Sequence, residues 1–110
     1  MTPRLYAVSR ADLPPGVQAV QAAHSLLSFA IIHPDLVRVW GEDSQNLILL
    51  SAPDEAALCW LCACAERDGH LYSAFREPDL GGQLTAVTFE PAAARMLSGY
   101  PLLLREKVSA

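Results

Sequence analysis

The stretch GVQAVQAAHS, residues 16–25, follows the turn-like segment ADLPP and predicts the opening of an apolar helix. Pro14 and Pro15 set the entry and Pro34 marks the end, because proline disfavours a helical residue before it. We therefore expect a helix from about residue 16 to residue 32. Gln21 and His24 fall on one partly polar stripe of a 3.6-residue wheel. The rest of the surface is apolar, so we expect the helix to be buried on most sides.

The polar stripe has two interpretations. Gln21 and His24 can hydrogen-bond to neighbouring backbone, or they can line a ligand site. The start of the helix also faces the loop after the first strand, so its free amide groups could hold an anion or a developing oxyanion.

The remaining segments complete an α/β pattern. We predict strands over 4–10, 46–52, 70–77 and 84–90, helices over 54–68 and 91–99, and a helical turn over 35–41 that leads into a loop. The strand over 46–52 is almost continuously apolar, which is typical of a strand covered on both faces. The last two strands should pair as a hairpin across 78–83, and PLLLRE (101–106) is either an edge strand or a packed tail. The sequence thus predicts one α/β domain over residues 1–110.

Composition excludes several classes of protein. The 110 residues are 52% apolar with a net charge of −4, and the basic residues are scattered. Nucleic-acid binders normally carry a basic patch, so strong autonomous binding to RNA or DNA is disfavoured. No apolar run approaches the roughly 18 residues of a membrane span, and the start of the chain lacks a cleavable hydrophobic segment. We expect a cytoplasmic protein.

The three cysteines are expected to pack in the core of the protein. Cys59, Cys62 and Cys64 lie in CWLCACA, and in an apolar helix they read as small buried side chains. A single CxxC lacks the four ligands of a closed zinc site. We expect no metal and no cofactor.

A second group of polar residues lies in FREPDLGG, residues 75–82. Arg76, Glu77 and Asp79 cluster at a strand end, two glycines follow, and Thr85 comes shortly after. Strand-end loops are where α/β sheets place their ligands. Two carboxylates near an arginine can perform acid–base work or bind an amine, while Pro-Asp before Gly-Gly is also ordinary turn chemistry.

RADLPPGVQAVQAAHS, residues 10–25, resembles the signature of the type 2 peptidyl-tRNA hydrolases, R-x-D-L-x-x-G-K-x-A-A-Q-x-x-H-A. The positions that match are Arg10, Asp12, Leu13, Gly16, Ala19, Gln21 and His24. Later segments, NLILLSAPDEAALCWLCACAERDG and LTAVTFEP, are similar to the family's middle and last strands and the helix between them. Trp40 would lie in the loop before the second strand. The resemblance implies a single mixed four-stranded β-sheet flanked by helices, and a homodimer.

The same resemblance implies a set of site residues. Glu77, or else Asp79, stands in for the family's catalytic aspartate, with His24 assisting. The substrate-binding residues carried over or placed near them are Arg10, Asp12, Gly16, Gln21, Arg76 and Thr85. The substrate would be the ester of a peptidyl- or aminoacyl-tRNA.

Two departures from the family pattern bear on activity. Val17 occupies the position of a lysine proposed to be catalytic, and Thr85 lies later than the family's loop threonine. Three hypotheses follow: a tRNA ester hydrolase, a non-catalytic module that binds a small ligand or a partner, or a different hydrolase or transferase built on the Glu-Pro-Asp loop. The last of these requires Glu77, Asp79 and Arg76 to point into one cleft with His24.

Overall fold

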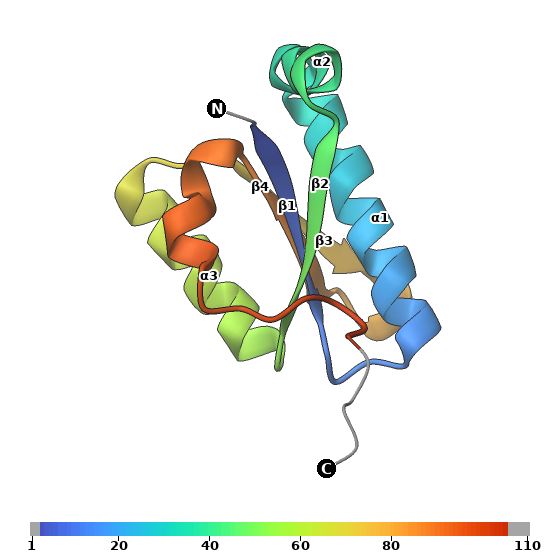
Figure 1. Ribbon diagram of the computed structural model, residues 1–110. Coiled ribbons are helices and arrows are strands. Elements are labelled where there is room, and N and C mark those ends of the chain that lie inside the picture. The colour runs from blue at the N-terminus through green and yellow to red at the C-terminus, as the bar shows by residue number, and fades with distance from the viewer. Residues whose placement is uncertain (1–2, 106–110) are drawn as a thin grey trace.

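One sheet with helices on both faces forms the body of the protein (Figure 1). The computed structural model describes residues 3–105. Its elements are β1 (Arg4–Arg10), α1 (Pro15–Ile32), α2 (Pro34–Asp43), β2 (Asn46–Ala52), α3 (Glu55–Asp68), β3 (Tyr72–Glu77) and β4 (Gln83–Phe89). Two short 3-10 helices, η1 (Pro78–Leu80) and η2 (Pro91–Leu97), follow β3 and β4. No helix within 3–105 is both long and apolar enough to cross a membrane.

The strand order is β2-β1-β4-β3. β1 runs parallel to β2 and antiparallel to β4, and β3 and β4 form a hairpin. The predicted mixed four-stranded sheet is therefore confirmed. Figure 1 shows α1 on one face of the sheet and α3 with η2 on the other.

The face beneath α3 holds the apolar core. Side chains from three strands pack there with α3 and η2; the largest are Tyr6, Val8, Leu50, Leu58, Leu61, Leu84, Val87, Phe89 and Leu97. Local signals position α3 over this core. Asp54 caps its start by accepting a hydrogen bond from the Ala57 amide, and Gly69 ends it in the left-handed conformation, at φ 73°.

The face beneath α1 is polar instead. The side chains that α1 buries are Gln18, Gln21, Ala22, Ser25 and Phe29, whereas Leu27 and Ile31 are 63% and 80% exposed. The expectation that this helix is buried on most sides is therefore wrong. Burial follows the polar stripe because the sheet presents hydroxyl groups to it, and no element in residues 3–105 covers the opposite side.

Hydrogen bonds join α1 to this face of the sheet. Ser25 Oγ lies 2.8 Å from Thr88 Oγ1, and Ser28 Oγ lies 2.7 Å from Ser73 Oγ. Ser9 Oγ donates to the main-chain oxygen of Gln18 at 2.8 Å. Since a buried hydroxyl destabilises a fold only when it lacks a partner, this polar packing is stable.

Three further expectations need correction. β2 is an edge strand with Leu47 exposed, because α1 lies against β1, β3 and β4 and leaves β2 uncovered on that side. Trp40 lies in α2, which is longer than the predicted turn, and its indole donates to Asn46 O at 2.8 Å. β3 begins at Tyr72, two residues later than predicted.

The segment after η2 covers the outer edge of β2. The Ser51 amide donates to Pro101 O at 2.8 Å, and the Leu103 amide donates to Leu49 O at 2.9 Å. Of the two alternatives for PLLLRE, an edge strand or a packed tail, the structure shows over 101–105 a segment that lies along β2 and makes one isolated bridge; Glu106 lies outside the described residues.

Two leucines test this division between core and surface. Leu58 is fully buried and Leu102 is largely exposed. Leu58→Ala should lower the free energy of unfolding by about 2–5 kcal/mol, because it removes core contacts and leaves a cavity. Leu102→Ala should lower it by less than about 1 kcal/mol. Denaturant unfolding followed by circular dichroism measures both, and equal losses would contradict the assignment of the core.

Candidate functional site

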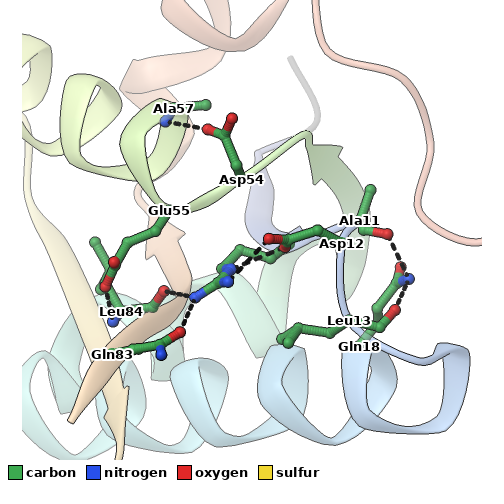
Figure 2. A network of polar contacts seen from close by, with 10 residues as sticks. Ala11, Asp12, Leu13, Gln18, Asp54, Glu55, Ala57, Gln83 and Leu84 are labelled. Atoms are coloured by element: carbon green, nitrogen blue, oxygen red, sulfur yellow. Dashed lines mark hydrogen bonds and ion pairs between the residues drawn. The ribbon is translucent and has the colours of Figure 1, made fainter. Parts of the chain in front are cut away.

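The end of β1 is held by a buried arginine. Arg10 Nε and Nη2 donate to the two carboxylate oxygens of Asp12, both at 2.9 Å. Its Nη1 donates to Gln83 Oε1 at 2.9 Å and to Leu84 O at 3.2 Å (Figure 2). The hydrogen bond from Arg10 lowers the pKa of Asp12, and the same bond raises the pKa of Arg10. Arg10 therefore ties the turn after β1 to β4.

Two more side chains in Figure 2 fix the entry into α1 and α3. Gln18 Nε2 donates to Leu13 O at 2.6 Å and to Ala11 O at 3.2 Å, which closes the turn before α1. Glu55 Oε2 accepts a hydrogen bond from the Leu84 amide at 2.7 Å. The first turns of both helices are thus anchored to fixed backbone.

A β-bulge in β4 aims a hydroxyl at α1. Phe75 pairs with Ala86 but Arg76 pairs with Leu84, so Thr85 is the extra residue. Bulges redirect side chains and are common beside functional sites. Thr85 Oγ1 donates to the Oε1 of Gln21 at 2.6 Å.

Gln21 connects Thr85 to Glu77, at the end of β3. Its Nε2 donates to Glu77 Oε1 at 3.2 Å, and its side chain is almost fully buried. Because Thr85 occupies the amide oxygen, the amide nitrogen is left to face the carboxylate. The chain Thr85–Gln21–Glu77 therefore orients Glu77, and we call it the amide bridge.

A pocket of about 470 Å³ lies beside the amide bridge, between the start of α1 and η1. Its lining residues are Pro14, Gly16, Val17, Val20, Gln21, Glu77, Asp79 and Leu80. One part of the wall is aliphatic and the other carries two carboxylates. Within residues 3–105, Asp79 has no side-chain hydrogen bond and neither carboxylate has an ion-pair partner.

The structure gathers some of the predicted site residues and separates others. Gly16, Gln21, Glu77 and Asp79 line the pocket, with Thr85 behind Gln21. Arg10 and Asp12 form an ion pair with each other, and neither lines the pocket. Sequence reasoning missed three lining residues, Pro14, Val20 and Leu80. The available signal was that each lies within two residues of a predicted site residue, namely Gly16, Gln21 and Asp79.

Arg76 and His24 also lie outside the pocket lining. Arg76 is exposed, and its Nη1 lies 3.5 Å from Gly82 O. The His24 ring packs on Phe75 with ring centroids 4.6 Å apart, and its Nδ1 is buried without a hydrogen-bond partner in residues 3–105. A catalytic Glu-Pro-Asp loop requires Arg76 and His24 to face the same cleft as Glu77 and Asp79. Residues 3–105 do not show this arrangement.

Other hollows carry ionisable groups that pair with each other. Near β3, Tyr72 donates its hydroxyl to Glu66 at 2.8 Å, and this bond raises the pKa of Tyr72 to about 12. Near η2, Arg67 Nε lies 3.0 Å from Asp68 Oδ1. The pocket beside the amide bridge differs from these two hollows because neither of its carboxylates has an ion-pair partner or accepts a tyrosine hydroxyl in residues 3–105.

The three cysteines of α3 differ in burial. Cys64 is buried and Cys62 is half-buried, but Cys59 is exposed, so the expectation of burial is wrong for Cys59. Burial raises the pKa of Cys62 to about 11, which keeps this thiol protonated at neutral pH. Among residues 3–105 there is no cluster of three or more side chains suited to hold a metal ion.

Comparison with protein-family models and with curated proteins finds no match to this chain. The resemblance to the type 2 peptidyl-tRNA hydrolases accordingly stays a proposal. The pocket and the amide bridge are therefore the basis for a functional proposal.

The Arg10–Asp12 pair makes stability depend on pH. The folded-state pKa of Asp12 is lowered, so its contribution is present above the unfolded pKa of about 3.9 and is lost as pH falls through the folded value. Since the Asp12 side chain is 42% exposed, solvent screens the pair, and Asp12→Asn should destabilise by about 1 kcal/mol at neutral pH.

The test is urea unfolding from about pH 6 to about pH 2. Wild type should lose more stability over this interval than Asp12→Asn. Asp43→Asn, at an exposed carboxylate outside the network, is the control and should behave like wild type. Parallel curves for wild type and Asp12→Asn would show that the pair contributes nothing.

Proposed function

We propose that this domain is a binding module whose pocket takes a small ligand bearing an aliphatic ammonium group, without chemical turnover. The ammonium group would lie between the carboxylates of Glu77 and Asp79. The alkyl part would pack against Val17, Val20 and Leu80, which line the same pocket. An alkylammonium ligand would therefore match both the acidic and the aliphatic parts of the pocket wall. A cytoplasmic location, as expected from the sequence, would suit a small metabolite of this kind.

The observation that carries this proposal is the orientation of Glu77 by Gln21. One carboxylate oxygen, Oε1, accepts the Gln21 amide, and Oε2 is left free of hydrogen bonds from residues 3–105. A fixed acceptor loses little freedom when a ligand arrives. Two opposite unit charges about 4 Å apart attract each other by about 1 kcal/mol in water and by about 4 kcal/mol at a partly desolvated site. Two carboxylates in the pocket therefore supply useful affinity for an ammonium group.

The charges near the pocket disfavour catalysis on a tRNA ester. Val17 offers no cation, Arg10 is engaged with Asp12, and Arg76 is directed to the Gly82 carbonyl. Within residues 3–105, then, no cation lines the pocket to meet an RNA phosphate or a developing oxyanion. The net charge of −4 also opposes long-range attraction of nucleic acid.

Hydrolysis of a peptidyl- or aminoacyl-tRNA ester is the second candidate, and one observation favours it. Pro14 gives α1 no side-chain cap, so the first-turn amides of Gly16 and Val17, at the pocket beside Glu77, have no hydrogen-bond partner within residues 3–105. Glu77 would orient a water, and these amides would stabilise the oxyanion. On this proposal the fold is of the type 2 peptidyl-tRNA hydrolase kind, as the sequence resemblance implies.

Titration with hexylammonium tests the binding proposal. Wild type should bind it saturably, and Glu77→Gln or Asp79→Asn should each weaken binding about 5- to 30-fold, which corresponds to about 1–2 kcal/mol. Glu42→Gln is the matched control, because it removes one exposed carboxylate on α2 and changes the net charge equally. Hexanoate should not bind. Equal weakening by Glu42→Gln would reduce the effect to general electrostatics and contradict the proposal.

A labelled peptidyl-tRNA separates the two candidates. The binding module should leave the ester intact, both as wild type and as Val17→Lys. Release of peptide by wild type, abolished in Glu77→Ala, would instead establish the hydrolase and overturn the claim of binding without turnover. Release that persists in Glu77→Ala but is lost in Asp79→Ala would also establish the hydrolase, whereas release that persists in both variants would point to a contaminating hydrolase.

A further inference from the structure

The two outer edges of the sheet differ in how they are covered. The strand order β2-β1-β4-β3 makes β2 and β3 the edge strands. The segment after η2 hydrogen-bonds along β2, at the Ser51 amide and the Leu49 oxygen. β3 pairs with β4 on one side, and no segment in residues 3–105 pairs with it on the other. An open strand edge of this kind is a template for a further strand.

Main-chain groups of β3 point outward from this edge. The Glu90 amide donates to Leu71 O at 3.1 Å, so these two residues form a hydrogen-bonded pair at the start of the β3–β4 ladder. Hydrogen-bonded and non-hydrogen-bonded pairs alternate along an antiparallel ladder, and this register is unbroken up to the bulge. The amide and carbonyl groups of Tyr72 and Ala74 therefore face away from β4. They have no hydrogen-bond partner in residues 3–105.

A hollow of about 550 Å³ lies along this edge. It is lined by residues 71–74, by Ile32 and His33 at the end of α1, and by Glu66 and Gly69 at the end of α3. The two helices lie on opposite faces of the sheet (Figure 1). A single hollow that touches both helix ends must therefore wrap around the sheet edge between them, which is β3. We call this hollow the edge groove.

The two sides of the edge groove differ in chemistry. On the side of α1, Ile32 is 57% exposed, and Leu71 shares the strand face of Ser73, which hydrogen-bonds to α1. On the side of α3, Glu66 accepts the Tyr72 hydroxyl and has no ion-pair partner in residues 3–105. One side therefore suits an apolar side chain, and the other suits a cation.

We propose that the edge groove binds an extended segment of another protein, which joins the sheet antiparallel to β3. Main-chain groups of the segment would bond to Tyr72 and Ala74, and its side chains would alternate between the two faces of the sheet. The recognised segment is apolar at the positions that face α1. It carries Lys or Arg opposite Tyr72, beside the Glu66 carboxylate.

A second copy of this chain fits the edge groove less well. Two β3 strands pair antiparallel with Arg76 of the partner subunit opposite Tyr72 in only one register. That register also sets Glu77 of the partner subunit on the apolar side, opposite Leu71. A net charge of −4 further opposes self-association, whereas it attracts a basic segment.

The edge groove is separate from the pocket beside the amide bridge, because the two share no lining residue. The segment proposal therefore does not depend on the proposed function.

Binding of a synthetic peptide tests the segment proposal. The probe is the capped, dye-labelled hexapeptide Thr-Val-Thr-Val-Lys-Val, whose lysine falls opposite Tyr72 and whose valines face α1. Fluorescence anisotropy should show saturable binding with a Kd on the order of 100 μM, since a short strand makes few hydrogen bonds. The same peptide with Glu in place of Lys should bind at least about 5-fold more weakly. Absence of saturable binding by the lysine peptide would overturn the proposal.

N-methylated peptides distinguish strand addition from adsorption to the surface. Methylation of the central Thr nitrogen removes the donor that faces Ala74 O, and it should weaken binding about 10-fold. Methylation of the next Val nitrogen, which faces away from β3, is the matched control and should change binding by less than about 2-fold. Equal weakening by the two methyl groups would show that the peptide does not pair with β3.

Protein variants test the charge and the alternative occupant. Glu66→Gln keeps an acceptor for the Tyr72 hydroxyl and should weaken binding of the lysine peptide about 2- to 5-fold, whereas Glu42→Gln on α2 should not. Equal effects of the two would contradict the proposal. Ala74→Pro removes an outward amide, which an edge strand tolerates. If wild type sediments as a dimer and Ala74→Pro dissociates it, a second copy occupies the edge groove and the proposal is wrong.

Discussion

A buried amide, Gln21, holds three parts of the protein in one arrangement. Its oxygen accepts the Thr85 hydroxyl from the bulge in β4, and its nitrogen donates to Glu77 at the end of β3. Because both ends of the amide are used, α1 has one favourable rotation over the sheet. The position of the Glu77 carboxylate follows from that rotation.

The same rotation decides which face of α1 meets solvent. Ser25 and Ser28 continue the hydrogen-bonded contact with the sheet beyond Gln21, so the polar stripe is buried along most of the helix. Leu27 and Ile31 consequently point outward. One set of polar contacts thus produces both the oriented carboxylate of the pocket and the exposed apolar side of α1.

Local sequence patterns predicted most of the helix and strand boundaries. Pro14, Pro15 and Pro34 delimit α1, Gly69 ends α3, and the strands β1 and β2 match their predicted ranges. The burial of α1 was not predictable, because it depends on hydroxyl groups from β1, β3 and β4 that only the folded sheet brings together. The loop chemistry indicated Glu77 and Asp79, but the capture of Arg10 by Asp12, Gln83 and Leu84 requires contacts distant in sequence. For the same reason, sequence alone left Arg10 free for a ligand.

The central claim is that the pocket oriented by Gln21 receives an ammonium group. The most direct measurement is a nitrogen–proton correlation spectrum of the labelled protein during titration with hexylammonium. The account predicts saturable shifts concentrated at the amides of Gly16, Val17, Gln21, Asp79 and Leu80. Shifts that do not saturate, or that spread evenly over exposed acids such as Glu42 and Glu66, would contradict it.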